Sequence, residues 1–187
     1  MRKLAAFIQV SVDGYFADVE GGIGWAHKDP DDAEWNEFVA ANAKGGGQLL
    51  FGRITYEFMA SYWPTPMAAA NSPVVAERMN SLPKIVFSRT LEEASWRNTQ
   101  LLKGDLVSEV RELKEGAGED MAILGSGSII SQLAQAGLID EFQIVVNPVA
   151  LGKGNALFDG IRSLPLMLTK TRAFANGNVF LCYEPAQ

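Results

Sequence analysis

Apolar residues along this chain fall into two patterns, short runs and longer segments with helical spacing. The runs end abruptly at glycine, serine or charged residues, and they lie at 4–10, 48–51, 84–87 and 121–124. Such runs are typical of strands buried on both faces. Segments with helical spacing lie between and after them, at 29–42, 53–61, 74–81, 105–115 and 128–137. Lys-Gly-Gly-Gly at 44–47 is expected to end the first helix. The alternation predicts parallel strands connected by helices.

The chain beyond residue 138 has a different pattern, because strand-like segments follow one another without intervening helices. They lie at 142–148, 166–174 and 179–183. Ala-Asn-Gly-Asn at 175–178 is a hairpin signal between the last two segments. The predicted fold class is therefore α/β, a three-layer sandwich with a mostly parallel central sheet and antiparallel C-terminal strands. We expect residues 1–187 to form a single domain.

Composition argues against several classes of protein. The formal net charge of −6 disfavours nucleic-acid binding, which usually needs a basic face. The single cysteine, Cys182, cannot form an intrachain disulfide and is expected to be a buried structural thiol. The single histidine, His27, has no second His or Cys with which to build a metal site. No apolar run reaches the ~20 residues of a membrane span, and the start lacks a signal-peptide pattern. We expect a cytoplasmic protein that binds neither membrane nor nucleic acid.

The segment 121–130 carries the strongest chemical signal. An apolar run ends in Gly-Ser-Gly-Ser at 125–128, and apolar residues with helical spacing follow at once. A strand, a glycine turn and a helix in this order let backbone N–H groups approach an anion at the positive end of the helix dipole. A phosphate group is the expected ligand. The alternative is an ordinary turn in which Ser126 or Ser128 serves as the helix N-cap.

Three marked segments each follow a predicted parallel strand: Gly52-Arg53, Ser88-Arg89-Thr90 and the turn at 125–128. Ligands in such sheets bind at the carboxyl ends of the strands. Arginine suits phosphate because its planar fork donates two parallel hydrogen bonds. The three segments together suit a dinucleotide with an extra 2′-phosphate, which favours NADPH over NADH. Alternatively, Arg53 and Arg89 are solvated residues at helix starts. The spacing does not match the Gly-x-Gly-x-x-Gly fingerprint of a Rossmann domain.

Several segments resemble known reductases. Phe-Gly-Arg-Ile-Thr-Tyr-Glu at 51–57, the segments 12–17 and 24–25, and the turn at 124–129 are similar to motifs of dihydrofolate reductases. The second half is more similar to the reductase domain of bacterial riboflavin biosynthesis. That family combines Ser-x-Asp-Gly, Gly-Ser-Gly before a helix, Gly-Leu-Ile-Asp-Glu and Pro-Val-x-Leu-Gly, which stand here at 11–14, 125–127, 137–141 and 148–152. The resemblance covers nearly the whole chain and implies a dihydrofolate reductase-like fold.

The resemblance also implies which residues hold the cofactor. The residues implied to meet its phosphates are Gly52, Arg53 and Thr55. Those implied to flank the adenosine 2′-phosphate are Ser88, Arg89 and Thr90. The pyrophosphate would be cradled by Gly125, Ser126, Gly127, Ser128 and Ile129. The nicotinamide would lie near Phe16 and Ala17, and the substrate would contact Asp13, Trp25 and Trp35.

Reduction of a C=N group needs a proton as well as a hydride, and Asp32 is the best local candidate for the acid. Its position one helical turn before Trp35 would place it beside an aromatic wall. Asp32 could instead only neutralise the start of its helix, and Asp31 could take either role. Asp13 could be a turn residue whose carboxylate binds nearby backbone. Trp35 has the spacing of a core residue as well as a pocket residue.

The implied function is an NADPH-dependent reductase of a C=N heterocycle. The specific expectation is a ribosylaminopyrimidine, as in 5-amino-6-(5-phosphoribosylamino)uracil reductases. Reduction of dihydrofolate or a dihydropterin is the alternative. The acidic residues Asp-Pro-Asp-Asp at 29–32, with Glu34 and Glu37, are however unfavourable for binding an anionic folate. A nucleotide-binding protein without turnover, or a flavin as the ligand, stays open. A homodimer through the C-terminal strands is compatible with their apolar surface.

Overall fold

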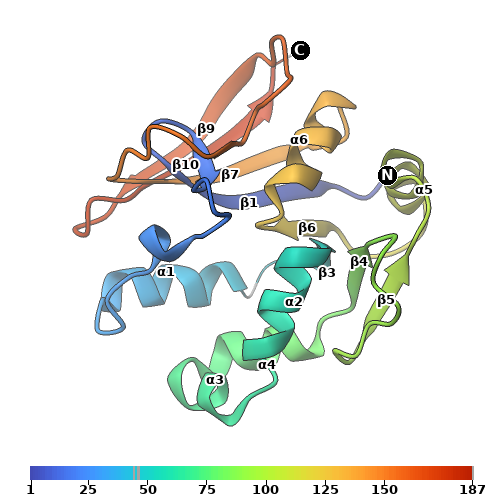
Figure 1. Cartoon of the computed structure of the whole chain (residues 1–187), viewed down its shortest axis with the longest axis horizontal. Coiled ribbons are helices and arrows are strands. Elements are labelled where there is room, and N and C mark those ends of the chain that lie inside the picture. Colours follow the sequence, from blue (N-terminus) through green and yellow to red (C-terminus); the bar gives the residue numbers. More distant parts are fainter. Residues whose placement is uncertain (44, 46, 187) are drawn as a thin grey trace.

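The computed structural model describes residues 1–43, 45 and 47–186, and its framework is an eight-stranded sheet (Figure 1). The strand order is β5-β4-β3-β6-β1-β7-β10-β9. The first six strands in this order pair in parallel, whereas β10 is antiparallel to both β7 and β9. The bounds are β1 Leu4–Ser11, β3 Gln48–Gly52, β4 Lys84–Phe87, β5 Thr99–Leu102, β6 Met121–Leu124, β7 Glu141–Asn147, β9 Leu166–Ala173 and β10 Val179–Pro185. This confirms the predicted mostly parallel sheet with antiparallel C-terminal strands.

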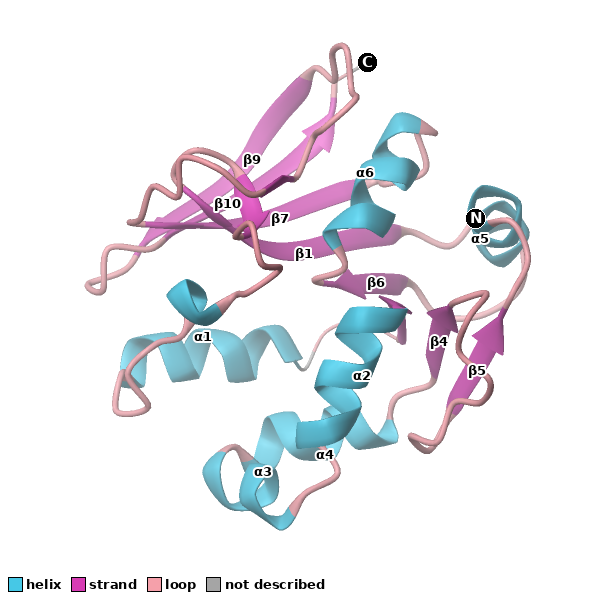
Figure 2. Ribbon diagram, viewed as in Figure 1, coloured by secondary structure: helices cyan, strands magenta, loops and turns pink. Residues whose placement is uncertain are grey.

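Helices cover both faces of the sheet and complete the three layers (Figure 2). On one face, α5 (Leu106–Glu115) and α6 (Gly127–Gln135) pack on β1 and β6. On the other, α2 (Arg53–Tyr62) and α4 (Pro73–Ser81) pack on β3 and β4, and α1 (Ala33–Ala43) packs towards β7 and β10. The short α3 (Pro66–Asn71) precedes α4. Among the described residues, no helix is both long and apolar enough to cross a membrane.

Strand β1 differs from its prediction in one informative respect. Its even-numbered apolar residues are buried in the core against α6, as expected for a central strand. Its odd-numbered residues Phe7 and Gln9 are only partly buried, because their face borders a cavity rather than a closed core. The expectation that this strand is buried on both faces is therefore wrong for one face. That face forms part of the candidate site.

Some elements were not predicted. Strand β5 at the edge of the sheet was missed, and so were α3 and a small second sheet of β2 (Tyr15–Ala17) and β8 (Asn155–Ala156). The predicted end of the first helix falls partly on residues 44 and 46, which lie outside the described residues. The predicted hairpin turn at 175–178 joins β9 to β10. Strand β9 is the outer strand of the sheet and is mostly exposed. The homodimer expected through the C-terminal strands stays a prediction.

Candidate functional site

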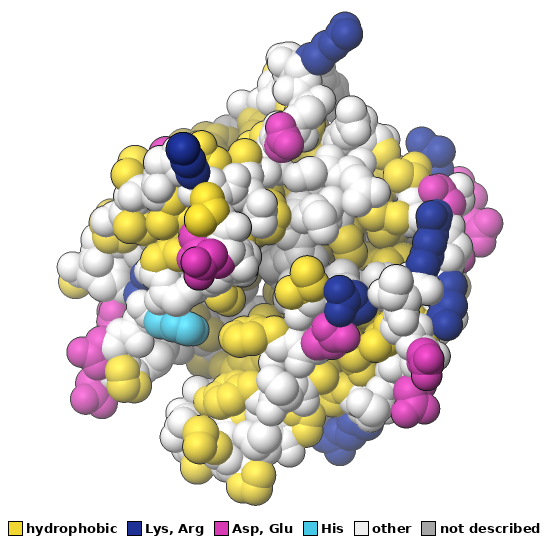
Figure 3. Space-filling model, viewed as in Figure 1, with side chains coloured by type: hydrophobic (Ala, Val, Ile, Leu, Met, Phe, Trp, Pro, Cys, Tyr) yellow, Lys and Arg dark blue, Asp and Glu magenta, His cyan; other side chains and the backbone are white. Residues whose placement is uncertain are grey.

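A cavity of about 820 Å³ lies between the sheet and the helices α1, α2 and α4. Hydrophobic side chains are visible around the hollow in the space-filling view (Figure 3). Its wall at the carboxyl ends of the strands includes the turn at 125–128, Phe16, Trp25 and Thr55. The volume lies within the few hundred to one thousand Å³ typical of small-molecule sites. The cavity is therefore large enough for a planar substrate and part of a cofactor.

The glycine turn that follows β6 has an unusual backbone. Gly125 and Ser126 both have left-handed conformations, with φ of +58° and +56°. For serine this conformation costs about 1–2 kcal/mol, so the surrounding structure must hold it. The holding contacts come from the neighbouring strand end. The Ser126 N–H donates to the Thr55 hydroxyl at 3.1 Å, and the Gly52 N–H donates to Ser126 Oγ at 2.9 Å.

The start of α6 faces the cavity. Ser126 occupies the N-cap position, but its side chain makes no capping hydrogen bond, because its hydroxyl is used by Gly52. The first N–H groups of an α-helix have no acceptor within the helix. Gly127 and Ser128 carry two of these groups, and both residues line the cavity. The turn therefore has the features of an anion-binding helix start rather than of a self-capped one.

Phe16 on β2 covers this turn. A Cβ atom built on Gly127 would lie 2.4 Å from the Phe16 ring, closer than any real contact, so only glycine fits. A Cβ on Gly125 would lie 3.3 Å from the Thr55 methyl group in addition to the strain of its positive φ. Ile129, by contrast, is buried and packs on Gly52. Phe16, which the resemblance implies lies near the nicotinamide, thus packs its ring against the bare backbone of the turn.

The three marked segments lie at neighbouring strand ends, because β4, β3 and β6 are consecutive in the sheet. Gly52 joins the turn directly. Arg53 begins α2 and forms an exposed ion pair with Glu57 at 2.9 Å. Ser88 lies one strand further along, where its hydroxyl accepts from the N–H groups of Thr90 and Leu91 at 3.2 and 3.0 Å.

Arg89, between Ser88 and Thr90, is exposed, and its charge acts on Asp105, whose pKa is lowered mainly by hydrogen bonds from Ser108. The segment 88–90 does not belong to the cavity wall. It would therefore meet an extended ligand outside the cavity.

The predicted substrate residues separate into two groups. Trp25 lines the cavity, as does Ala17 of the predicted cofactor site, and the Trp25 indole N–H donates to the Gly22 carbonyl at 3.2 Å. Trp35 borders the cavity but is also a core residue, with ring centroids 5.4 and 5.3 Å from those of Phe38 and Phe174.

Asp13 does not line the cavity. Its carboxylate accepts from the Ser11 hydroxyl at 2.6 Å and from the Gly152 and Leu151 N–H groups at 2.7 and 3.1 Å. These hydrogen bonds, that from Ser11 first, lower the pKa of Asp13 to about 2. The geometry matches the turn role of Asp13 rather than the expected substrate contact, because the carboxylate already serves loop backbone.

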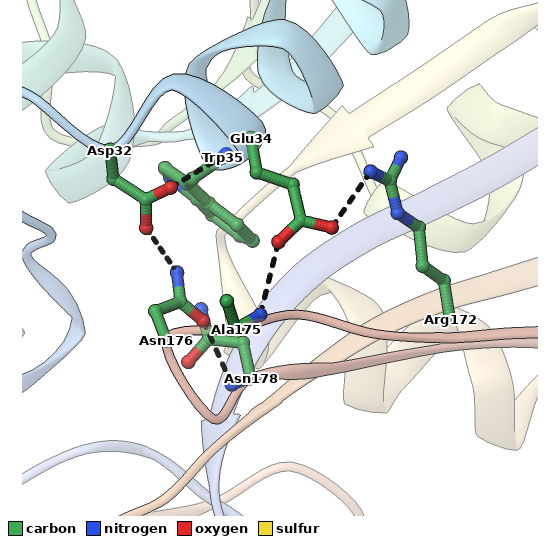
Figure 4. Close-up of polar contacts among 7 residues, drawn as sticks. All are labelled: Asp32, Glu34, Trp35, Arg172, Ala175, Asn176 and Asn178. Carbon is green, nitrogen blue, oxygen red and sulfur yellow. Dashed lines mark hydrogen bonds and ion pairs between the residues drawn. The ribbon is translucent and has the colours of Figure 1, made fainter.

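Asp32 is likewise not part of the cavity wall, and both of its carboxylate oxygens have partners (Figure 4). Oδ1 accepts from the Trp35 N–H at 2.9 Å and thereby caps α1. Oδ2 accepts from the Asn176 side chain at 2.7 Å. Glu34 adds a second link to the same hairpin, through the Ala175 N–H at 3.0 Å and Arg172 at 3.1 Å. Asp32 thus has the capping role, and its geometry does not support the expected role as acid.

Sequence reasoning missed Lys28 and Gln9, two polar residues of the cavity wall. Lys28 lines the cavity, and its ammonium donates to Asn147 Oδ1. Burial lowers the pKa of Lys28, and the charge of Asp32 has a smaller opposite effect. Gln9 lines the cavity from β1, and its Oε1 is buried without a hydrogen-bond partner. A glutamine within an apolar run was a usable signal for Gln9. Lys28 stands in a polar loop and gave none.

Comparison with known proteins agrees with this geometry. The model of the RibD C-terminal domain matches residues 2–180. The chain belongs to this family. Among curated relatives, the uncharacterized protein YyaP of Bacillus subtilis (strain 168) is 28% identical over 184 residues, which cover 98% of this chain and 95% of YyaP. YwjB of the same organism, also uncharacterized, is 25% identical over 174 residues, or 92% of each chain.

Solved structures of RibD-like proteins share the fold. A putative riboflavin biosynthesis protein from Shewanella superposes with a TM-score of 0.76 at 25% identity, over 99% of both chains. A bifunctional deaminase/5-amino-6-(5-phosphoribosylamino)uracil reductase from Thermotoga maritima gives 0.65 at 16% identity, over 99% of this chain and 57% of the Thermotoga chain. A pyrimidine reductase-like protein from Corynebacterium diphtheriae gives 0.64 at 13% identity, over 100% and 92%. By family the chain is a RibD C-terminal domain, and its fold is that of riboflavin-biosynthesis reductase-like proteins.

Proposed function

We propose that this RibD-family protein is an NADPH-dependent reductase that delivers a hydride to the C=N group of a heterocyclic substrate. A ribosylaminopyrimidine of the riboflavin-biosynthesis type is the specific candidate. The observation that carries the proposal is the strained turn at 125–126, which is tied to the end of β3 and opens on a cavity of suitable size. Family membership supports the same reaction class.

The residues present fit a dinucleotide. The first N–H groups of α6 lie at the cavity, and the Phe16 ring packs on Gly127 beside them. These groups would hold the pyrophosphate, with Thr55 and Arg53 beside it at the start of α2. Ser88, Arg89 and Thr90 would meet the 2′-phosphate of the adenosine, one strand further along the sheet edge. When bound, NADPH supplies the hydride, and the protein supplies orientation and an apolar, water-poor wall.

The test has a binding step and a turnover step. A thermal-shift and calorimetric screen with NADPH, NADH, FMN and dihydrofolate first identifies the cofactor. We expect stabilisation by NADPH, weaker stabilisation by NADH and none by FMN. Oxidation of NADPH is then followed with the ribosylaminopyrimidine phosphate and with dihydrofolate as acceptors.

We expect oxidation with the pyrimidine substrate. Binding of NADPH without consumption with either acceptor would favour the non-catalytic binder. Preference for FMN would contradict the assignment of the turn to a nicotinamide cofactor.

A further inference from the structure

The two faces of the sheet are packed differently. On the face covered by α5 and α6, one continuous apolar core extends from β4 to β7. On the opposite face the core is divided, with one cluster over β3 and β4 and another around Trp35 over β7 and β10. The central strands β1 and β6 lie between these two clusters. The middle of the sheet therefore has no closed core on this face.

Apolar side chains on this face of the central strands remain partly exposed. Ala5 and Phe7 of β1 pair with Ala122 and Leu124 of β6, and all four border the cavity. Strands in the middle of a parallel sheet are normally buried on both faces. We call the space above them the inner chamber. Its wall is formed by Ala5, Phe7, Ala122 and Leu124 on the sheet, and by Val39, Ala43, Met79 and Leu82 opposite them.

The inner chamber has a mouth of its own. The cavity wall includes residues of β1 from Leu4 to Gln9, a length of about 17 Å along the strand. The glycine turn lies at the carboxyl end of this length. At the amino end the wall includes Lys3, Asp120 and Glu184, which are exposed to solvent. A ligand can therefore enter the chamber at the amino ends of the strands, away from the turn.

Acidic side chains outnumber basic ones at this mouth. The charged wall residues there are Asp120, Asp140, Glu141, Glu184, Lys3 and Arg78. Asp140 already has a cation as partner, because the Lys114 ammonium donates to it. The Arg78 guanidinium donates to the Ala43 carbonyl at 3.3 Å and so joins α4 to the end of α1.

Glu141 and Glu184 lie opposite each other at the mouth. Tyr183 of β10 pairs with Phe142 of β7, and the next pair in this antiparallel register is Glu184 with Glu141. Carboxylates directly opposite on neighbouring strands repel each other. Glu141 accepts from the Gln143 side chain, but in the part of the chain that the structure describes neither glutamate forms an ion pair. A cation at the mouth would relieve the repulsion.

We propose that the inner chamber binds an elongated apolar molecule that ends in an amine. Its chain lies against Ala5, Phe7 and Ala122, between the sheet and α1, and its ammonium lies at Glu141 and Glu184. Removal of apolar surface from water drives the binding, and the charge at the mouth sets the orientation. This ligand differs in chemistry from the heterocycle proposed as hydride acceptor, and its site lies at the other end of the cavity from the glycine turn.

Four probes test the chain and the charged end separately. Binding of decylamine, butylamine, decanol and decanoate to the full chain is measured by calorimetry, below the concentrations at which micelles form. Each CH₂ group that enters an apolar cavity strengthens binding by about 4-fold. We therefore expect decylamine to bind at least about 100-fold more tightly than butylamine. We expect it to bind about 10-fold more tightly than decanoate, with decanol between them.

Variants that fill the chamber locate the chain. Ala5→Leu and Ala122→Leu each enlarge a side chain on the floor of the chamber. Each should weaken decylamine about 10-fold or more, since about two CH₂ groups of the ligand lose their place. Both variants should bind NADPH as the parent does. Ala70→Leu, on the exposed surface of α3 outside the cavity, is the matched control and should leave decylamine binding unchanged.

A second set of variants tests the charged end. The double variant Glu141→Gln with Glu184→Gln should lose the preference for decylamine over decanol and keep the effect of chain length. Glu92→Gln with Glu93→Gln removes two exposed charges outside the cavity and should keep the preference.

Nuclear Overhauser effects locate the chain without any substitution. In protein with labelled methyl groups, bound decylamine should show contacts to the methyl groups of Ala5, Val39 and Ala122. It should show none to Ala17, which borders the cavity near the glycine turn.

The outcomes are distinct from those of the proposed function. Absence of saturable decylamine binding overturns the inference, and so do equal affinities of butylamine and decylamine. Tighter binding of decanoate than of decylamine overturns the assignment of the ammonium to Glu141 and Glu184. Contacts to Ala17 in place of Ala5, or displacement of decylamine by NADPH, would place the chain at the glycine turn and overturn the inner chamber as its site. Failure of NADPH to bind overturns the reductase proposal alone.

Discussion

The Gly52 N–H donates a hydrogen bond of 2.9 Å to the Ser126 hydroxyl, so the ends of β3 and β6 are joined directly. The Ser126 N–H donates a hydrogen bond of 3.1 Å to the hydroxyl of Thr55, the third residue of α2. Ser126 makes these contacts from a left-handed conformation that serine rarely adopts. The shape of the turn is therefore set by the neighbouring crossover as well as by its own glycines.

Two replacements of Ser126 distinguish the contribution of its hydroxyl to stability from the cost of its strained backbone. Ser126→Ala keeps the strained φ and removes the acceptor of Gly52, so we expect the free energy of unfolding to fall by about 1–2 kcal/mol. Ser126→Gly also removes the hydroxyl but relieves the strain, so its loss should be smaller. Urea unfolding of the three proteins measures the order. An alanine variant as stable as the parent, or more stable than the glycine variant, would contradict this account.

Gly127→Val tests the contact between the turn and Phe16. The Cβ atom would meet the Phe16 ring at 2.4 Å, so the ring or the turn must move. We expect binding of NADPH, measured by calorimetry, to be lost or weakened at least 100-fold. Unchanged affinity in the folded variant would remove the turn from the cofactor site.

A double variant distinguishes a steric effect on Phe16 from a direct effect on the cofactor. Phe16→Ala combined with Gly127→Ala removes the clash while it keeps a methyl group at the cradle. If Gly127 serves the pyrophosphate, the double variant should bind NADPH more weakly than Phe16→Ala alone. Equal affinity of the two would indicate that Gly127 serves only to accommodate the ring.

Asp32 was expected from sequence to be the acid, and the structure gives it a capping role that mutagenesis can test. Asp32→Ala should lower the free energy of unfolding by about 1 kcal/mol, since α1 loses its N-cap. Asp32→Asn caps well and should retain most of the stability and most of the kcat. A kcat that falls at least 100-fold in Asp32→Asn, with stability preserved, would restore the catalytic assignment.

Arg89→Ala tests the cofactor end of the site that lies outside the cavity. We expect NADPH to bind about 10- to 100-fold more weakly, because a charged contact to the 2′-phosphate is lost, and NADH to bind as before. Arg111→Ala is the matched control, because Arg111 is also exposed and acts on the same Asp105. Equal weakening of NADPH and NADH would refute the assignment of Arg89 to the 2′-phosphate.

Most of the fold could be predicted because its central strands are apolar runs with clear ends. The missed elements lack that signal. Strand β5 reads Thr-Gln-Leu-Leu and lies at an edge, where only one side pairs. Helix α3 lacks an apolar run, but its sequence does carry a helix-start signal, Thr65 followed by Pro66. In the structure Thr65 is the N-cap, and its hydroxyl accepts from the Ala68 N–H at 3.2 Å. The two-residue β8 is too short to show any periodicity.

The site was predictable in its backbone and less so in its side chains. The glycine turn can be recognised from consecutive residues, because the strand, the turn and the helix follow one another directly in the sequence. The role of a carboxylate depends on partners that lie far away in the sequence. Asp32 meets Asn176 across 144 residues, and Lys28 meets Asn147 across 119. No local pattern reports such pairs, which is why Asp32 was assigned to the cavity and Lys28 was missed.

Lys84 gives a prediction for the dependence of stability on pH. The residue is only 1% exposed. Its ammonium donates to the Leu82 carbonyl at 2.6 Å and lies 4.6 Å from the centroid of the Trp96 ring. Burial, assisted by the nearby charge of Arg97, lowers the pKa of Lys84 from 10.5 to about 8. The unfolded chain, in which the lysine is hydrated, retains a pKa near the ordinary value. Between these two pH values the unfolded state therefore binds more protons than the folded state.

The contribution of Lys84 to the free energy of unfolding should accordingly rise from pH 8 to pH 10.5, by at most about 3 kcal/mol, and stay constant above that range. As pH falls through 8 this contribution disappears, because the folded state also takes up the proton. Urea unfolding of the parent and of Lys84→Met across this range isolates the effect, since other titrating groups cancel in the difference. A difference that does not change with pH would show that Lys84 keeps its ordinary pKa, and that its bond to the Leu82 carbonyl offsets the cost of its burial.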